Sequence, residues 1–284
     1  MTRARAFPIV LVAVVAALAA SGVSGAVKPM ATIKPPAHIA SSGTLQVCVD
    51  ISYPPAEYYA SNGSTALGTD IDMSQQIAKL FGVKVQFVKS PFSSIIPALL
   101  TKKCDAVISA LTDTAERRKQ VAFVDYLKVN SAFLVVPGNP KGIHKIGDLC
   151  GRGIAIISGE NWGPFLEKQK STCSKQGKGT LTISTFNTFA DELQQLTLHR
   201  VDAIATSTVN GAYIVTQKAT KGKVELAKPN VPYSTGAWGI AVPKGNSALK
   251  VALTKAVRKL NRSGAMRKIF VANHLVDAYV PANP

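Results

Sequence analysis

The residues best placed to do chemistry lie between Phe92 and Phe123. Thr112 and Thr114 stand in a hydroxyl-rich turn after a short apolar run, and Arg117 follows within about one helical turn. At a helix start, free backbone N–H groups and the helix dipole attract negative charge, and an arginine can fork onto a carboxylate. These residues therefore predict a binding site for a small carboxylate.

The elements that must position this site alternate between strands and helices. The first part of the chain has a strand at 45–50, a helix at 70–81, a strand at 83–88, a helix near 93–101 and a strand at 105–109. The second part has a strand at 153–157, a helix near 162–172, a strand at 181–186, a helix at 190–198 and a strand at 202–206. This alternation predicts an α/β fold with mostly parallel sheets, and ligands then lie beyond the carboxyl ends of the strands.

Two extended segments, 131–137 and 236–243, connect the two parts and predict a hinge. The helix near 247–261 then returns to the first part. We therefore expect one lobe formed by 43–130 and 235–284, and a second lobe formed by 131–234. The carboxylate site falls in the cleft between them.

The N-terminus has the order of a secretory signal. Arg3 and Arg5 precede an apolar run at 7–20, and small residues continue to Ala26. This run is shorter than the ~20 residues of a membrane-spanning helix, although an uncleaved anchor stays open. We expect a signal peptide at 1–26 and a disordered leader at 27–42. The first cysteine is Cys48, so we expect a soluble product in the periplasm or extracytoplasmic space and not a lipoprotein.

The formal net charge is +17, but the lysines are scattered along the chain. No basic helix is interleaved with aromatic residues, so we expect no nucleic-acid partner. The four histidines are isolated, which predicts no metal site, and nothing points to a cofactor. No nucleophile elbow, phosphate loop or Cys–His signature appears, so we expect no enzyme.

An exported chain permits disulfides. Cys150 precedes the strand at 153–157, and Cys173 lies near the end of the following helix, which returns beside its strand. We therefore predict a Cys150–Cys173 bridge. Cys48 and Cys104 lie in or beside neighbouring strands, but their registers are offset by roughly 10 Å at ~3.3 Å per residue, so two buried thiols are favoured there.

The chain resembles the polar amino-acid solute-binding proteins of ABC importers, the bacterial extracellular solute-binding proteins of family 3. The resemblance runs from about Gly43 to Tyr279 and also includes the 92–123 segment. Its other signature pieces are GTLQVCVDISYPP at 43–55, GTDIDMSQQIAKLFGVKVQFV at 68–88 and NRSGAMRKIF at 261–270. It implies a two-lobed periplasmic-binding-protein type II fold that closes around its ligand and delivers it to an ABC transporter permease, and we expect a monomer.

The resemblance also implies site residues. Asp50 would meet the ligand side chain, Tyr53 and Phe92 would stack on it, and Arg117 would grip its α-carboxylate. The turn at 158–161 would offer backbone N–H groups to the same carboxylate. The remaining expected contacts are Ser109, Ala110, Thr112, Gly159, Glu160, Asn161 and Ser207.

Two positions depart from the family pattern. Glu160 stands where a Ser or Thr is usual, and Ser207 stands where an Asp pairs with the ligand's α-ammonium. A buried cation without an anionic partner is costly. Either Glu160 or Asp50 replaces the missing charge, or the ligand is not an ordinary α-amino acid. Glu160 is also readable as a first-turn acid that the helix dipole stabilises.

Two other functions stay open at this point. Cyclohexadienyl dehydratases share this fold and an export signal, and a buried Glu160 could act as their general acid. A ligand-sensing module for a membrane receptor is the other alternative.

Overall fold

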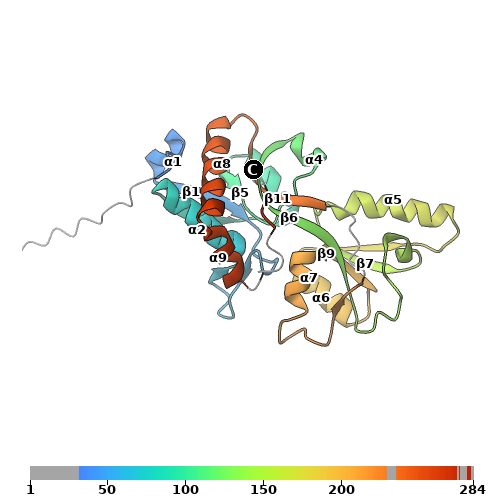
Figure 1. Ribbon diagram of the computed structural model, residues 1–284. Coiled ribbons are helices and arrows are strands. Elements are labelled where there is room, and N and C mark those ends of the chain that lie inside the picture. The colour runs from blue at the N-terminus through green and yellow to red at the C-terminus, as the bar shows by residue number, and fades with distance from the viewer. Residues whose placement is uncertain (1–31, 229–234, 274, 276–279, 283–284) are drawn as a thin grey trace, which may run out of the picture.

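A computed structural model describes residues 32–228, 235–273, 275 and 280–282. The expected signal peptide at 1–26 and the start of the leader lie outside these residues. The chain forms two α/β lobes, with β6 and β11 running between them (Figure 1). Among the described residues, no helix is both long and apolar enough to cross a membrane.

Lobe 1 is built on β4–β1–β5, followed in the sheet by β11 and the first part of β6. Its strands are β1 (Thr44–Val49), β2 (Tyr58–Tyr59), β3 (Ala66–Leu67), β4 (Lys84–Lys89), β5 (Ala106–Val107), β6 (Val121–Val135) and β11 (Thr235–Pro243). Its helices are α1 (Ala37–Ser42), α2 (Thr69–Phe81), the 3₁₀ helix η1 (Phe92–Ser94), α3 (Ile95–Leu100), α4 (Ala115–Arg118), α8 (Ser247–Arg262) and α9 (Ala265–Ala272). The pairs β1–β4 and β1–β5 are parallel, as predicted.

Lobe 2 continues the sheet from the end of β6 through β9, β7 and β8. Its strands are β7 (Gly153–Ile157), β8 (Thr182–Phe186), β9 (Ala203–Ser207) and β10 (Glu225–Leu226). Its helices are the 3₁₀ helix η2 (Ile146–Leu149), α5 (Trp162–Lys175), α6 (Phe189–Thr197) and α7 (Thr208–Ile214). The α/β alternation in both lobes agrees with the sequence pattern, whereas α7, β2, β3 and β10 were not predicted.

The long strand β6 joins the lobes. Residues up to Asn130 pair antiparallel with β11, and residues from Ser131 pair antiparallel with β9. The sequence predicted only an extended segment from 131, because the residues before it lack a clear strand period. Helices α8 and α9 pack on α2, so the C-terminal part returns to lobe 1 as expected. The exact boundaries of the lobes at 130/131 and 234/235 stay a prediction.

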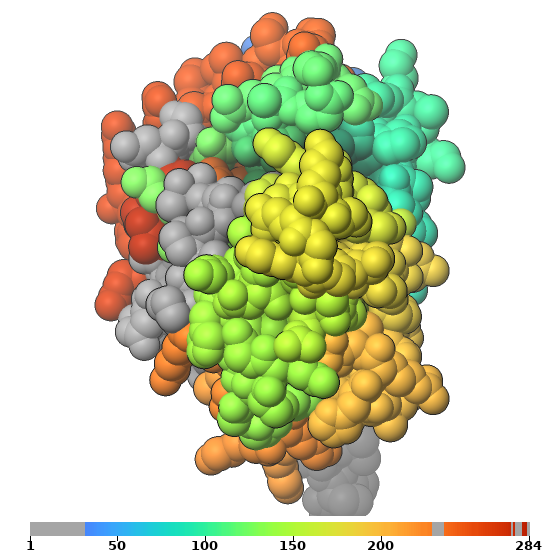
Figure 2. All heavy atoms as spheres, turned by 90° about the vertical axis from the view of Figure 1, so that its right-hand side faces the viewer, coloured from blue at the N-terminus to red at the C-terminus, as the bar shows by residue number. Residues whose placement is uncertain are grey.

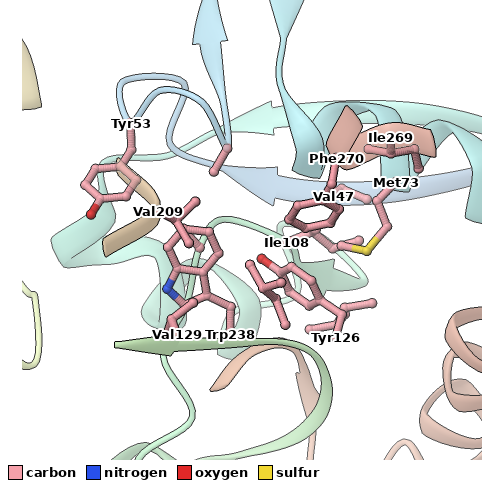
Figure 3. Close-up of a cluster of buried hydrophobic side chains, with 14 of the residues drawn as sticks. Val47, Tyr53, Met73, Ile108, Tyr126, Val129, Val209, Trp238, Ile269 and Phe270 are labelled. Atoms are coloured by element: carbon pink, nitrogen blue, oxygen red, sulfur yellow. The ribbon is translucent and has the colours of Figure 1, made fainter. Parts of the chain in front are cut away.

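The core of lobe 1 lies between the sheet and helices α2, α8 and α9. Figure 3 shows Val47, Met73 and Phe270 packed together near Tyr126, whose side chain is fully buried. The apolar face of α2 (Met73, Ile77, Phe81) follows helical spacing, and Gly82 ends the helix in the left-handed conformation. This packing fixes β1 and β5, whose carboxyl ends carry the site.

Both disulfides are present, which confirms Cys150–Cys173 and makes the prediction of two free thiols at Cys48 and Cys104 wrong. The Cα atoms of Cys48 and Cys104 are 5.6 Å apart. The expected offset assumed that Cys104 extends in line with its strand. However, β5 begins only at Ala106, and Cys104 packs in the same cluster as Cys48 and Leu99 of α3.

The leader prediction also needs correction at its end. Residues 37–42, expected to be disordered, form α1, which packs its buried Ile39 into the lobe 1 core. Thr32 and Ile33 donate backbone hydrogen bonds to the carbonyl of Leu80. This segment therefore belongs to the folded lobe, because Ile39 and the partly buried Ile33 both pack against the core.

Candidate ligand-binding site

A cavity lies between the lobes, beyond the carboxyl ends of the strands. Its empty volume is about 600 Å³, a figure that includes the solvent space at its mouth. Eight of the predicted residues form part of its wall: Asp50, Tyr53, Phe92, Ala110, Thr112, Glu160, Asn161 and Ser207. Ser109, Arg117 and Gly159 lie just behind the wall.

Asp50 follows β1 directly. Its N–H donates to Ser109 Oγ at 2.9 Å, and its Oδ2 accepts the N–H of Phe92 at 2.8 Å. Burial raises the pKa of Asp50, and hydrogen bonds from Ser52 and Phe92 oppose this rise. Asp50 therefore fixes the first turn of η1 and faces the cavity at the same time.

Glu57 is a site residue that the sequence analysis missed. It is 1% exposed and lines the cavity. Its Oε1 accepts a 2.9 Å hydrogen bond from Ser109 Oγ, whereas Oε2 is buried without a partner. Burial, and then the charge of Asp70, raise its pKa well above the usual range. The available signal was its position in the same loop as Tyr53, only two residues after Pro55.

Asp70 fixes the turn after β5 through a hydrogen bond to its backbone. Its Oδ2 accepts the N–H of Ala110 at 2.6 Å, and Tyr126 OH donates to it at 2.8 Å. Ala110 has φ +43°, a conformation that L residues adopt rarely, and this anchor keeps it there. Burial raises the pKa of Asp70 to about 6. The anchored turn places Ala110 and Thr112 in the cavity wall.

Aromatic rings form the sides of the cavity. Tyr53 meets Trp238 edge-on, with centroids 6.2 Å apart, and Figure 3 shows these two side chains beside Val129 and Val209. Phe92 lies on the other side, 5.5 Å from the guanidinium carbon of Arg117. Trp162, at the start of α5, also lines the cavity. Tyr53 and Phe92 therefore both lie in the cavity wall, and their stacking on a ligand stays a prediction.

Tyr53 also connects the lobes. Its hydroxyl lies 2.8 Å from Thr206 Oγ1 and accepts a hydrogen bond from Ser207 N–H at 3.3 Å. Beside it, Asn210 Nδ2 donates to the carbonyl of Pro54 at 2.6 Å. These bonds hold the lobes in a closed arrangement.

Arg117 is 9% exposed, but the structure does not place it in the cavity wall. Its Nη1 donates to the Thr112 carbonyl at 2.8 Å, and its Nη2 donates across the cleft to the Gly159 carbonyl at 3.0 Å. Burial lowers its pKa to about 10, while the charges of Glu160 and Asp113 oppose this shift. Figure 2 views the molecule from the end at which α5 projects, with the green segment that contains α4 above the yellow segment that contains α5.

The turn before α5 differs from its expected role. The N–H of Ser158 donates to the Phe186 carbonyl at 2.8 Å, and the N–H of Glu160 donates to the Ile157 carbonyl at 3.1 Å. The prediction that this turn offers its N–H groups to a carboxylate is therefore wrong for these two. Both N–H groups already donate to backbone carbonyl groups, so neither is available to a ligand.

Glu160 turns its carboxyl group into the cavity. Its Oε2 is buried and has no hydrogen-bond partner. Burial raises its pKa to about 8, against the opposing effects of the Ile157 backbone and of the Arg117 charge. Glu192 on α6 is also buried, with Oε1 unpartnered, and the charge of Glu160 contributes to its raised pKa.

Ser207 is the N-cap of α7. Its Oγ accepts the N–H of Asn210 at 3.1 Å and a hydrogen bond from Tyr53 OH at 3.2 Å. The side chain therefore lines the cavity, but it supplies no charge and its oxygen is already used. In the described part of the chain, no cluster of side chains could hold a metal ion.

Comparisons with known proteins agree with this geometry. The family model for bacterial extracellular solute-binding proteins, family 3, matches residues 45–272. The histidine-binding periplasmic protein of Escherichia coli (strain K12) is 26% identical over 247 residues, which cover 83% of this chain and 89% of that protein. A solved ancestral arginine-binding protein bound to arginine is 33% identical with a TM-score of 0.73, and the match covers 81% of this chain and 97% of that one.

A third similar structure bears on the enzyme alternative. It is the ancestral amino acid-binding protein AncCDT-1, a precursor of cyclohexadienyl dehydratase, with 29% identity and a TM-score of 0.70 over 83% of this chain and 97% of that one. Even this neighbour is itself described as a binding protein, and the family is one of binding proteins rather than enzymes. The two lobes, the cleft between them and the match over most of the chain show that the protein belongs to the bacterial extracellular solute-binding proteins, family 3.

Proposed function

We propose that this protein captures a cationic L-amino acid outside the cytoplasmic membrane and presents it to an ABC transporter permease. The observation that carries this proposal is the charge of the cavity wall. Three carboxyl groups, those of Asp50, Glu57 and Glu160, line it, and none of the described residues in the wall is Lys, Arg or His. A cationic ligand supplies the partner that these buried acids lack.

The aromatic walls suit the same ligand. A guanidinium or ammonium group over the face of Tyr53, Phe92 or Trp238 gains cation–π attraction, and the stem of the side chain packs between the rings. An acidic amino acid would place its side-chain carboxylate, in addition to its α-carboxylate, among the three carboxyl groups of the wall. The arginine-bound ancestral structure and the histidine-binding relative are consistent with a basic amino acid.

Binding is coupled to lobe closure. Arg117 and Tyr53 make hydrogen bonds from lobe 1 to lobe 2 only when the lobes are together. A ligand that touches both lobes therefore favours the closed state, which is the form that a permease can distinguish from the empty one. We expect the protein to act as a monomer.

The test begins with native mass spectrometry of the purified protein and extraction of any bound small molecule under denaturing conditions. Isothermal titration calorimetry on refolded protein then compares L-arginine, L-lysine, L-histidine, L-glutamine and L-glutamate. We expect the cationic amino acids to bind more tightly than L-glutamine, and L-glutamate not to bind. Preference for L-glutamate, or no binding of any amino acid, would overturn the proposal.

The variants Asp50→Asn and Glu57→Gln test where the preference arises. Each removes one negative charge with little change in shape. If the lobe 1 carboxyl groups select the cationic end, both variants narrow the gap between L-arginine and L-glutamine. An unchanged gap in both would place the selecting charge elsewhere.

A further inference from the structure

Position 207 cannot hold a ligand cation in this protein. Ser207 is neutral, and its oxygen accepts hydrogen bonds from Asn210 N–H and Tyr53 OH. The neighbouring Thr206 donates to Asn210 Oδ1 at 2.8 Å. The hydroxyl groups at the end of β9 therefore serve helix α7 and the contact between the lobes. An α-ammonium group needs another partner.

Glu160 meets the requirements for that partner. It lies in the cavity wall on lobe 2, and its Oε2 is buried without a hydrogen bond. Asp50 is a poorer candidate because its Oδ2 already accepts the N–H of Phe92. Glu57 also has a free oxygen, but it lies with Asp50, Ser109 and Asp70 on lobe 1.

The position of Arg117, the residue expected to bind the ligand's α-carboxylate, distinguishes Glu160 from Glu57 as the partner of the α-ammonium group. The α-ammonium and α-carboxylate groups of an amino acid are attached to one carbon atom, so their two partners must be neighbours. Arg117 Nη2 donates to the carbonyl of Gly159, the residue directly before Glu160. The charges of Arg117 and Glu160 also influence each other. No comparable contact joins Arg117 to Glu57 among the hydrogen bonds and ion pairs of the described residues.

We propose that Glu160 is the residue that binds the α-ammonium group of the ligand, beside Arg117, so that the recognition of this group has moved from the end of β9 to the turn before α5. This inference rests on the proposed function, since it requires an amino-acid ligand. Glu57 and Asp50 then meet the cationic end of the side chain from lobe 1. The ligand spans the cleft between acids on opposite lobes.

The arrangement also gives the buried, unpaired carboxyl group of Glu160 a role in lobe closure. Glu160 Oε2 has no hydrogen-bond partner among the described residues, and the charge of Glu160 helps to raise the pKa of Glu192. Closure without ligand therefore leaves an acid desolvated and unpaired, which is costly. When the lobes close around a ligand, the ammonium group of the ligand pairs with Glu160. Glu160 thus makes closure depend on the presence of an amine.

The experiment compares two probes that differ only in the α-amine, L-arginine and 5-guanidinopentanoate, by calorimetry at constant pH. The wild-type protein should prefer L-arginine. In Glu160→Gln, affinity for L-arginine should fall about 30-fold or more, the size expected when one partner of a buried charge pair is lost. Affinity for 5-guanidinopentanoate should change little. The control Glu167→Gln, an exposed acid on helix α5 just after the turn that carries Glu160, should behave as wild type.

A rescue separates this role from a fault in folding. Adding Ser207→Asp to Glu160→Gln restores a carboxylate at the end of β9 and should recover part of the lost affinity for L-arginine. Equal loss for both probes, or unchanged affinity for L-arginine, would overturn the assignment while leaving the proposed function intact. If the wild-type protein binds no amino acid, the proposed function fails and this inference fails with it.

Discussion

Arg117 Nη2 donates a 3.0 Å hydrogen bond to the carbonyl of Gly159 and thereby connects helix α4 of lobe 1 to the turn before α5 of lobe 2. The same guanidinium holds the carbonyl of Thr112, a residue of the cavity wall. Arg117 therefore acts on closure directly, in addition to any contact with a ligand carboxylate. This double role leads to the first prediction.

Arg117→Ala should weaken the binding of L-arginine by roughly 2–4 kcal/mol, because a charge-assisted partner and a bond between the lobes are lost together. Calorimetry measures the change. The exposed Lys119, just after α4, provides the control, since it forms an ion pair with the equally exposed Glu116. Lys119→Ala should bind as wild type. Unchanged affinity in Arg117→Ala would remove this residue from the binding mechanism.

Gly159→Ala should hinder closure. A Cβ atom at this position would lie 2.6 Å from the Cα atom of Ser93 in the other lobe, and φ is +87°, which disfavours any side chain. Small-angle scattering with and without L-arginine reports the compaction, which should be reduced in the variant along with affinity.

The control for this substitution lies four residues further on. A Cβ atom at Gly163, within α5, meets only Ile156 Cδ1 at 3.9 Å, an ordinary contact. Gly163→Ala should keep full closure and gain some stability, since Ala is the better helix former by about 1 kcal/mol. Equal compaction in both variants would show that the approach of Gly159 to Ser93 does not limit closure.

Much of the fold could be predicted because the strands and helices of each lobe carry a regular apolar period. The strand at 153–157 and the helix ending at Gly82 are examples. The full length of the 15-residue strand β6 could not be predicted, because its partner changes from β11 to β9 along its length and this change depends on tertiary pairing. The Cys48–Cys104 bridge was not predicted for a similar reason, because the residues before β5 have no alternating apolar pattern that would indicate the path of the chain.

The site residues also divide into those that a sequence pattern can locate and those that depend on tertiary structure. Residues at strand ends, such as Asp50, were found because the sheet brings those ends together. Glu57 was missed because a loop folds it beneath the cavity, and loops carry no periodic signal. That Arg117 grips a ligand carboxylate stays a prediction; its burial and its bond to Gly159 depend on how the lobes come together, which the sequence does not show.

The two disulfides should differ in their contribution to stability. Cys48–Cys104 closes a loop with a sequence separation of 56, and Cys150–Cys173 one of 23. Chain-entropy arguments give about 4 and about 3 kcal/mol for loops of these lengths, so removal of Cys48–Cys104 should lower the melting temperature more. Paired Cys→Ala variants measured by calorimetry test the order. Mass mapping that finds either pair as free thiols would contradict the corresponding bridge.

The stability of the ligand-free protein should fall as the pH rises from 5 to 8. Burial raises the pKa of Glu160 from 4.5 to about 8, so in this window the folded protein binds protons that the unfolded chain has released. The free energy of unfolding therefore decreases with increasing pH. Glu57, Glu192 and Asp70 have raised pKa values and act in the same direction.

Glu160→Gln isolates the contribution of one acid. Burial raises the pKa of Glu160, and the Ile157 backbone and the charge of Arg117 from α4 oppose this rise. The charge of Glu160 in turn helps to raise the pKa of Glu192 on α6. Tyr53 also lies within reach of its charge. The variant should show a flatter decline of melting temperature with pH than the wild type.

Ligand binding should depend on pH in the opposite sense. Glu160 must release its proton to pair with an ammonium group, so wild-type affinity for L-arginine should rise between pH 6 and about 8, and it should rise less steeply in Glu160→Gln. 5-Guanidinopentanoate, which has no α-amine, should gain less affinity than L-arginine over this range. A rise of the same size for both probes would mean that the titrating acid faces the side chain, and Glu57 would then be the group responsible.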